Sequence, residues 1–213
     1  MTPRPNPITI KRHPNVIILL HGFNSGPGNK AKEIKDFLIA KNLTDEYHLI
    51  APKIDYIPKR ARRDINKLIR KNKKCKIHLI GTSLGGFYAN YFRAKFNDDF
   101  LTVHTINPSW EPSKSLAIKK NQILENFKSN EKWEFKEEYL AQFEEQENFI
   151  KTHLKNCTAK NYHIHLSKSD ELLDFKEMLS YLESHRVHYV QTEYDSDHRF
   201  GKIKEIMNLI TNK

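Results

Sequence analysis

A serine set between glycines is the residue of this chain whose surroundings most plainly suggest chemistry. Residues 81–85 read GTSLG, which fits the pattern G-x-S-x-G. The apolar run KIHLI precedes the pattern and the helix-like stretch GFYANYF follows it, so Ser83 is expected at a sharp turn between a strand and a helix. Such a turn lifts the hydroxyl clear of the sheet, and the helix amino end stabilises negative charge beside it. Ser83 is therefore the predicted nucleophile of an acyl-transfer reaction.

A serine hydroxyl becomes a good nucleophile only when a base takes its proton and an acid orients that base. After a serine in such a turn, the acid and then a histidine are expected further along the chain. His198 lies in the polar stretch DSDHRFG, between the last predicted strand and the last predicted helix, and is the predicted base. Asp170 is the first carboxylate after the fifth predicted strand and is the predicted acid, with Asp174, one helical turn further on, as the alternative.

Acyl transfer also needs two N–H donors for the oxyanion. They usually come from the residue after the nucleophile and from the loop after an early strand. We expect the N–H groups of Leu84 and Phe23 in these roles, since Phe23 lies in the segment HGFNSG after the first apolar run. His21 begins that segment, and the sequence leaves open whether it orders the loop through hydrogen bonds or is an inert core histidine.

Short apolar runs alternate with longer amphipathic stretches, which is typical of βαβ units in a mainly parallel sheet. Strands are predicted at residues 16–21, 47–51, 76–80, 102–106, 162–166 and 187–191. Helices are predicted at residues 29–42, 58–72, 84–96, 169–185 and 200–212. We therefore expect an α/β fold with helices on both faces of the sheet. In such sheets ligands bind beyond the carboxyl ends of the strands, where the loops with the predicted site residues begin.

Residues 111–155 interrupt this alternation with one long charged and aromatic stretch. We expect them to form a helical lid or cap, inserted between the fourth and fifth strands of a single domain that spans residues 1–213. The insertion leaves the sheet next to Asn107, where the acyl group of a substrate must lie. The predicted substrate-binding residues are Asn24, Asn107, Trp110, Trp133 and Phe135. Phe127, Tyr139 and Phe143 are further candidate walls, although these aromatic residues could equally pack the lid onto the domain.

The chain is basic, with a formal net charge of +10, and its charge is unevenly distributed. Residues 53–76 contain eleven Lys or Arg and two Asp, so nearly all of the net charge lies in this basic block. The block either steers an anionic substrate such as an acyl-CoA toward the site or is a solvated helix that aids solubility. Residues 131–147 contain seven Glu and two Lys, which is typical of a solvated helical face.

Composition excludes several classes of protein. With 38% hydrophobic and 29% charged residues, the chain is neither disordered nor a disulfide scaffold. The apolar run VIILL is far shorter than the roughly 20 residues of a membrane helix, and the start MTPRPNPITIKRHPN lacks the apolar region of a signal peptide. We expect a cytoplasmic protein without membrane association. Cys75 and Cys157 lack the CxxC spacing of a zinc or redox site and are expected to be structural thiols. The predicted acyl-transfer reaction requires neither a metal nor an organic cofactor.

Several stretches, in order along nearly the whole chain, resemble the small YqiA/YcfP-like esterases of the α/β-hydrolase superfamily. They are LHGFNSGPGNKAKEI, IGTSLGGFYANYF, INPSWEP, SKSDELLDF and DHRF. HGFNS and GTSLGG are specific to that family, whereas DHRF and DELLD carry less weight alone. The resemblance implies an α/β-hydrolase fold with a Ser83, Asp170 and His198 triad, and it places Asn107-Pro108 at a strand end beside the nucleophile. The Glu- and Lys-rich insertion and the heavy basic block depart from the family, so its substrates are not carried over.

The residues and the resemblance together predict a serine hydrolase that cleaves the carboxylic ester or thioester bond of a small molecule through an acyl-serine intermediate. A related hypothesis keeps the triad but uses it for acyl transfer to another acceptor or for peptide cleavage. The rival from another class is a nucleic-acid or anionic-surface binding protein that keeps the scaffold and uses residues 53–76. A binding protein has little need for a filled triad, which favours the enzyme.

Overall fold

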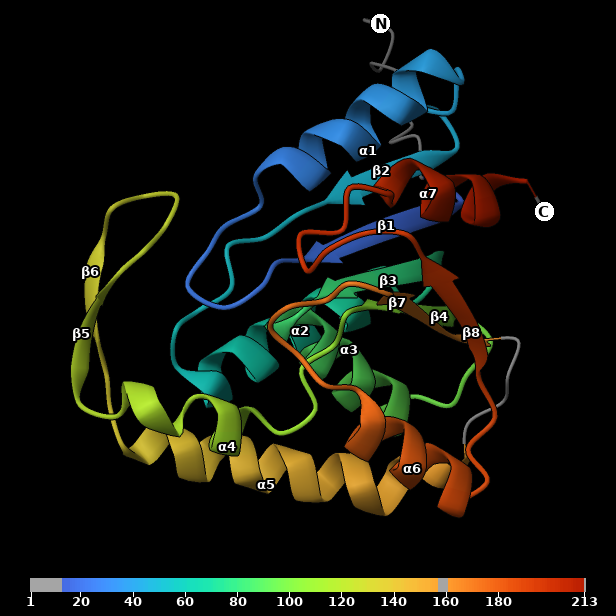
Figure 1. Ribbon diagram of the computed structural model, residues 1–213. Coiled ribbons are helices and arrows are strands. Elements are labelled where there is room, and N and C mark those ends of the chain that lie inside the picture. Colours follow the sequence, from blue (N-terminus) through green and yellow to red (C-terminus); the bar gives the residue numbers. More distant parts are fainter. Residues whose placement is uncertain (1–12, 157–160, 213) are drawn as a thin grey trace, which may run out of the picture.

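Six parallel strands form the main sheet of the computed structural model, which describes residues 13–156 and 161–212 (Figure 1). In spatial order the strands are β2 (Tyr47–Ile50), β1 (Asn15–Leu20), β3 (Lys76–Thr82), β4 (Leu101–Ile106), β7 (Tyr162–Ser167) and β8 (Val190–Tyr194). Neighbours in this order pair in parallel throughout, so all carboxyl ends meet at one edge. The expected parallel sheet is confirmed. Cys157 lies outside the described residues.

Helices cover both faces of this sheet (Figure 1). One face carries α1 (Asn29–Ala40) and α7 (Ile203–Thr211), and the other carries α2 (Pro58–Asn72), α3 (Leu84–Lys95) and α6 (Lys176–Ser184). Alternate residues of β1 serve the two cores: Ile17 and Leu19 pack toward α1 and α7, and Ile18 and Leu20 toward α2 and α3. Strands buried on both faces explain why they read as continuous apolar runs.

The segment between β4 and β7 contains a β-hairpin that the sequence did not predict. It begins with α4 (Pro112–Ser115) and a 3₁₀ turn (Ala117–Lys119), continues through β5 (Gln122–Glu125) and β6 (Lys132–Phe135), and ends with α5 (Glu138–His153) and a second 3₁₀ turn (Leu154–Asn156). The expected all-helical insertion is therefore wrong in its middle part. The strands read QILE and KWEF, each only four residues long and mostly exposed, which is too little alternation to stand out from the charged surroundings.

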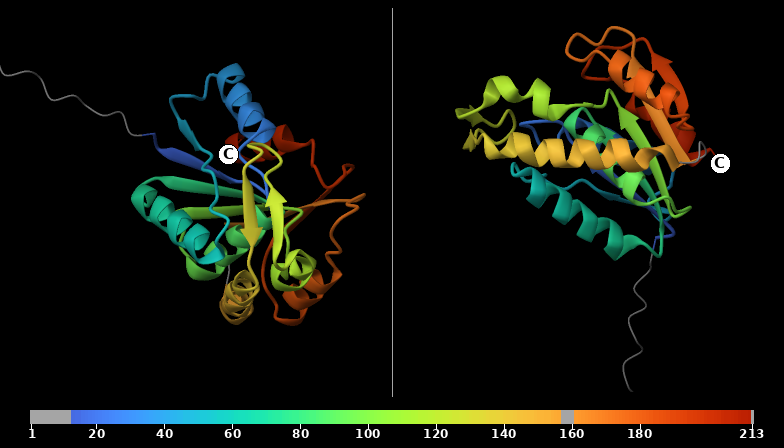
Figure 2. Two further views of the ribbon diagram at one scale, coloured as in Figure 1. Left: turned by 90° about the vertical axis from the view of Figure 1, so that its left-hand side faces the viewer. Right: turned by 90° about the horizontal axis from the view of Figure 1, so that it is seen from below.

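The hairpin and α5 occupy different sides of the molecule. β5 and β6 stand beyond the carboxyl ends of the main sheet, and the view onto that edge shows the hairpin in front of it (Figure 2, left). From below, α5 runs across the helical layer between α2 and α6 (Figure 2, right). It is held to α3 by edge-to-face packing of Phe87 on Phe143 and by Tyr91 against Phe149. The hairpin is thus the part of the insertion that stands beyond the edge where the site is expected.

Two element boundaries near the carboxyl-terminal end of the chain differ from expectation. A helix was predicted from residue 169, but α6 begins at Lys176. The Asp170 carboxylate accepts hydrogen bonds from the N–H groups of Leu172 and Leu173, and Asp174 accepts one from Lys176 N–H, so side chains take backbone donors and delay the helix. β8 begins at Val190, later than predicted, because the apolar Val187 packs into the core as part of a connection.

No helix within the described ranges has the length and apolar character to cross a membrane.

Candidate active site

Ser83 occupies the turn between β3 and α3 with a backbone conformation that is rare for any residue with a side chain, φ 52° and ψ −117°. The turn is held from the neighbouring strand β4, since Ser83 N–H donates to Ile106 C=O at 3.0 Å and Ser83 C=O accepts from Ser109 N–H at 3.0 Å. Strained backbone of this kind persists only where the surroundings fix it, and it is common at functional sites. The expected strand, turn and helix around Ser83 are confirmed.

The glycines around Ser83 allow close contact between backbone segments. A Cβ atom on Gly81 would lie 2.2 Å from Gly85 C=O, and one on Gly85 would lie 2.3 Å from Leu20 C=O. None of the glycines has a positive φ; the left-handed residue of the turn is the serine itself. The motif therefore needs glycine because β1, β3 and the first turn of α3 approach more closely than any side chain permits.

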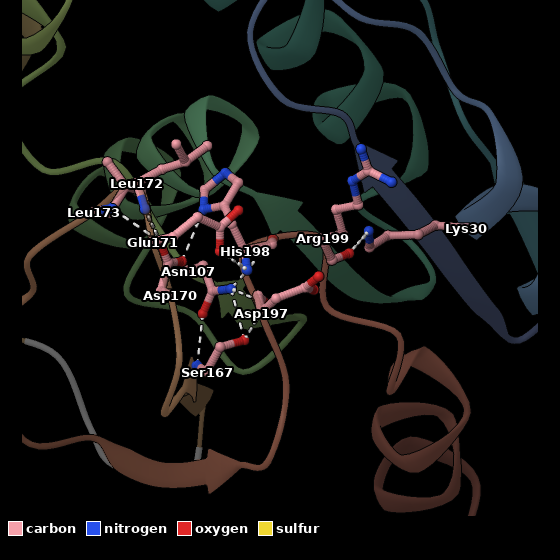
Figure 3. Close-up of polar contacts among 10 residues, drawn as sticks. All are labelled: Lys30, Asn107, Ser167, Asp170, Glu171, Leu172, Leu173, Asp197, His198 and Arg199. Carbon is pink, nitrogen blue, oxygen red and sulfur yellow. Dashed lines mark hydrogen bonds and ion pairs between the residues drawn. The ribbon is translucent and has the colours of Figure 1, made fainter.

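His198 and Asp170, the base and the acid that the sequence predicts, are hydrogen-bonded to each other (Figure 3). The distance from His198 Nδ1 to Asp170 Oδ2 is 2.8 Å, and the Asp170 side chain is only 2% exposed. The second carboxylate oxygen accepts the N–H groups of Leu172 at 2.9 Å and Leu173 at 2.8 Å. A carboxylate oxygen can only accept, so Nδ1 donates and Nε2 is left as the acceptor of the imidazole.

The alternative acid, Asp174, lies away from this pair. Its side chain is 70% exposed, and its Oδ1 accepts the N–H of Lys176 at the start of α6. Glu171, the residue after Asp170, accepts the backbone N–H of His198 at 3.1 Å. Geometry therefore favours Asp170 as the partner of His198, with Glu171 as a contact to the same loop.

Ser83, Asp170 and His198 all follow strands at the carboxyl edge of the sheet, namely β3, β7 and β8. In the described part of the chain, Ser83 Oγ makes no hydrogen bond to His198. Catalytic hydrogen bonds are often long without substrate and tighten during the reaction, so this does not argue against the pair. The Ser83 side chain lies beside the first loop, because a Cβ atom on Gly22 would be 3.8 Å from Ser83 Oγ.

The loop after β1 is ordered by His21. Its Nε2 accepts the N–H of Ile54 at 2.9 Å, so Nδ1 carries the proton and donates to Gly22 C=O, also at 2.9 Å. Burial lowers the pKa of His21 below its ordinary value, and this keeps the ring neutral as those two bonds require. Of the two possibilities left open by the sequence, the ordering role is confirmed.

A narrow cleft lies between this loop, the amino end of α3 and the hairpin. Its walls are His21, Gly22, Phe23, Asn24, Ile54, Asp55, Tyr56, Leu84, Tyr88, Trp133 and Phe143. Both predicted oxyanion donors, Phe23 and Leu84, belong to this lining. The cleft offers about 20 Å³ to the centres of water molecules, which is room for little more than one water. A larger molecule therefore fits this cleft only if part of the lining moves.

The hairpin closes the cleft through contacts with the loops after β1 and β2. The Trp133 indole stacks on the Tyr56 ring, with centroids 4.2 Å apart, and its N–H donates to Asn24 Oδ1 at 2.8 Å. Asn24 Nδ2 donates to Glu125 C=O at 2.7 Å, and Asn24 C=O accepts from Phe127 N–H at 3.0 Å. Asn24 thus joins both strands and the turn of the hairpin to the loop that contains Phe23.

The five predicted substrate-binding residues occupy three kinds of position. Asn24 and Trp133 line the cleft. Phe135 is 1% exposed and packs behind the cleft against Phe23, and Trp110 is buried against Tyr181 of α6. Asn107, 1% exposed, contacts the loop that carries His198.

Tyr88 is a cleft residue that sequence reasoning missed. It is 1% exposed, and burial raises the pKa of its hydroxyl. It falls one turn into α3, where the sequence pattern alone shows an ordinary core aromatic.

In the ranges that the structure describes, no three His, Cys, Asp or Glu side chains converge as a metal site would require.

The fold of this chain is similar to those of several solved structures. Est1E from Butyrivibrio proteoclasticus is 15% identical, with a TM-score of 0.66 over 98% of this chain and 91% of that one. The monoacylglycerol lipase of Paleococcus ferrophilus is 14% identical, with a TM-score of 0.66 over 92% of each chain. A thioesterase domain from the curacin biosynthetic pathway is 10% identical, with a TM-score of 0.64 over 94% of this chain and 92% of that one. At these identities the similarity establishes the α/β-hydrolase fold.

Family membership follows from the sequence over nearly its full length. The model of the Uncharacterised protein family (UPF0227) matches residues 16–212, from β1 to the end of α7. The match includes all of the stretches on which the resemblance rested. Ser83, Asp170 and His198 all fall inside it. The chain therefore belongs to UPF0227, the family of the YqiA/YcfP-like esterases.

Proposed function

We propose that this protein is a serine hydrolase that cleaves carboxylic ester or thioester bonds. The observation that carries the proposal is the His198–Asp170 pair, with its carboxylate buried, on loops at the same sheet edge as Ser83 in its strained turn. An aspartate that holds one ring nitrogen of a histidine leaves the other free to accept a proton from a serine. The esterases, lipase and thioesterase that share the fold support the same chemistry.

In the proposed reaction Ser83 Oγ attacks the acyl carbonyl carbon while His198 Nε2 takes the hydroxyl proton. The carbonyl oxygen becomes an oxyanion and accepts hydrogen bonds from the N–H groups of Phe23 and Leu84. As the bond to the leaving group breaks, His198 returns the proton to the departing alcohol or thiol. Water then attacks the acyl-serine, His198 takes its proton, and the acid leaves as the proton passes back to Ser83.

The lining of the cleft indicates what the acyl group contacts. Five of its eleven lining residues are Phe, Tyr or Trp, and among these Phe23 and Tyr56 contact Trp133 of the hairpin. We propose that residues 111–155 act as a lid of the single domain, with the hairpin as the part that meets substrate. Small-molecule esters and thioesters, acyl-CoA among them, are the proposed substrates, and none of the proposed steps uses a metal or an organic cofactor.

Replacing Ser83 with alanine tests the function directly. Ser83→Ala removes the covalent route, so hydrolysis of a short aryl ester should fall at least about a thousandfold with the protein still folded. A fluorophosphonate should label the native protein and fail to label this variant. Ser184→Ala, which removes an exposed serine on α6, is the matched control and should behave as the native protein. A Ser83→Ala protein that keeps half of the native rate would end the assignment.

A further inference from the structure

The loop that carries His198 has no regular structure of its own, so its position must be set by other parts of the chain. It connects β8, which ends at Tyr194, to α7, which begins at Ile203. Side chains from elsewhere contact the backbone of three consecutive residues, Asp197, His198 and Arg199 (Figure 3). These contacts hold the backbone to which the imidazole of His198 is attached.

Asn107 makes the central contacts. It follows β4 with a left-handed backbone, φ 42°, and its side chain is 1% exposed. Its Nδ2 donates to Ser167 Oγ at 2.8 Å and lies 3.3 Å from His198 C=O and 3.4 Å from Asp197 C=O. Its Oδ1 accepts the N–H of Ser167 at 2.8 Å. Both ends of the amide are thus engaged inside the protein.

Ser167, the last residue of β7, extends the same network. Its hydroxyl accepts from Asn107 and donates to Asp197 C=O at 2.7 Å. The side chain is almost fully buried, and a hydroxyl with one proton can donate to only one partner. Asn107 therefore acts on the His198 loop both directly and through Ser167.

Outer contacts to the loop come from the surface. Glu171 accepts His198 N–H at 3.1 Å, and Lys30 Nζ, at the start of α1, donates to Arg199 C=O. The Glu171 carboxylate is solvent-exposed, and exposed bonds of this kind contribute less than buried ones. Asn107 and Ser167 thus provide the contacts to the loop that lie inside the protein.

The segment from Ile106 to Ser109 also holds the nucleophile. Its backbone binds Ser83 on both sides, through Ile106 C=O and Ser109 N–H, each at 3.0 Å. The side chain of Asn107, inside the same segment, binds the His198 loop. One short piece of backbone therefore fixes the two groups between which the proton must pass.

We propose that Asn107 and Ser167 are positioning residues that set His198 against Ser83. Neither needs to touch substrate: they act through the backbone of residues 197 and 198. The proposal rests on the proposed serine-hydrolase function, and the Ser83→Ala result tests that function separately. If Ser83→Ala is inactive while the variants at Asn107 and Ser167 keep native activity, only the positioning role fails.

Asn107→Ala removes the direct contacts and the support of Ser167. A misplacement of about 1 Å can cost about a hundredfold in rate, so kcat for a short aryl ester should fall about 10- to 100-fold. KM should stay within about twofold, because the cleft lining is unchanged. The rate of inactivation by a fluorophosphonate should fall in parallel with kcat, since it needs the same activated serine.

Asn90→Ala is the matched control. Asn90, on α3, is an equally buried asparagine, 0% exposed, and its Oδ1 accepts the hydroxyl of Tyr162, in β7, at 2.8 Å. Within the described residues it makes no hydrogen bond to the His198 loop. It should lower the melting temperature as Asn107→Ala does while leaving kcat within about twofold of native, because no residue of the site depends on it. Equal losses of kcat in the two variants would mean that Asn107 contributes only general stability, and would overturn the proposal.

Ser167→Ala and Ser167→Thr keep the test decisive if Asn107→Ala does not fold. Alanine removes the hydroxyl relay to Asp197 and should lower kcat about tenfold or less, since the direct Asn107 contacts remain. Threonine keeps the hydroxyl and should restore most of the loss. If alanine retains native kcat, or if threonine is as slow as alanine, Ser167 does not position the base.

Discussion

Close backbone contact at the nucleophile turn makes single methyl groups costly. Gly85→Ala would place a Cβ atom 2.3 Å from Leu20 C=O and 2.8 Å from His21 C=O, and both are backbone atoms that cannot rotate away. We expect a loss of about 1–3 kcal/mol in the free energy of unfolding, the usual cost of overpacking, together with loss of activity because the first loop is displaced. Urea denaturation and aryl-ester hydrolysis measure the two effects.

Gly201→Ala is the control for this prediction. A Cβ atom on Gly201 meets no atom within 4 Å, and the residue has no positive φ. The same change of glycine to alanine should therefore leave the free energy of unfolding near the native value. If Gly85→Ala proves as harmless as Gly201→Ala, the backbone approach between β1 and α3 is looser than the structure shows.

Single residues differ in how far the sequence alone reveals their part in the site. Ser83, Asp170 and His198 follow from motif and chain order, because acyl transfer needs those residue types at strand ends. Asn107 also follows a strand, and was predicted to contact substrate. Its contacts with the His198 loop could not be predicted, since they join residues about 90 positions apart whose proximity exists only once β4, β7 and β8 are side by side.

At the scale of elements, the hairpin is the feature with the clearest functional consequence. Phe135 is buried in the core, so its truncation to alanine would lower the free energy of unfolding by about 3–5 kcal/mol. An activity measured on such a variant would not separate specificity from stability. Trp133 lines the cleft and is the better probe. Trp133→Ala should widen the cleft and raise kcat/KM for long acyl chains relative to short ones by about tenfold, judged from the effect of single methylene groups in apolar pockets. A series of aryl esters of graded acyl length measures the ratio.

Phe127→Ala provides the comparison within the same hairpin. Phe127 is 75% exposed in the turn between β5 and β6 and does not line the cleft. Its substitution should leave the length profile unchanged. An unchanged profile in a folded Trp133→Ala protein would remove the hairpin from the account of specificity.

Elements with strong periodicity were predicted well and short exposed ones were not. β1, β3 and β4 are buried on both faces, and α2 begins with Pro58, so composition marks them clearly. β5 and β6 are stable because of contacts with Asn24 and Tyr56, which lie about 100 and 75 positions away in the chain. The sequence of the hairpin itself does not indicate these distant contacts.

At the scale of the whole molecule, the two charged stretches of the sequence meet. Lys59 and Arg62 at the start of α2 pair with Glu145 of α5, and Lys53 pairs with Glu131 of the hairpin. The cations toward the end of α2 lie at the amino edge of the sheet, since β3 starts there. Much of the positive charge nearest the cleft is therefore balanced, which favours the solubility interpretation of residues 53–76 over the steering of anionic substrates.

A histidine buried in the sheet makes the stability of the whole fold sensitive to acid. His165 is 0% exposed and lies 3.2 Å from His104 Nδ1 and 3.1 Å from Tyr194 Oη. Burial, helped by the neighbouring His163, lowers its pKa to about 3, so the folded protein keeps it neutral. In the unfolded chain this histidine binds a proton near pH 6.5. The contribution of neutral His165 to the free energy of unfolding is therefore fully present above that pH, and it falls by about 1.4 kcal/mol per pH unit as pH falls toward 3.

Urea denaturation at several pH values between about 7.5 and about 4.5 tests this, within the range set by the two pKa values. His165→Gln keeps a polar side chain that does not titrate, and it should unfold with a pH slope smaller by about one proton than that of the native protein. Equal slopes in the two proteins would show that His165 protonates as readily in the folded state as in the unfolded one.

The bonds of Asn24 have a consequence for the order of events in each turnover. Because Asn24 joins the hairpin to the loop of Phe23, we expect this one of the two proposed oxyanion donors to be preorganised while the hairpin is seated. We expect a substrate too large for the cleft to displace the hairpin as it enters, and this would release the loop that carries Phe23. By thermodynamic reciprocity, whatever binds the ordered loop more tightly also draws the hairpin shut. Under the proposed mechanism, admission and catalysis would therefore need two arrangements of the same chain, and the reacting group itself would favour the second.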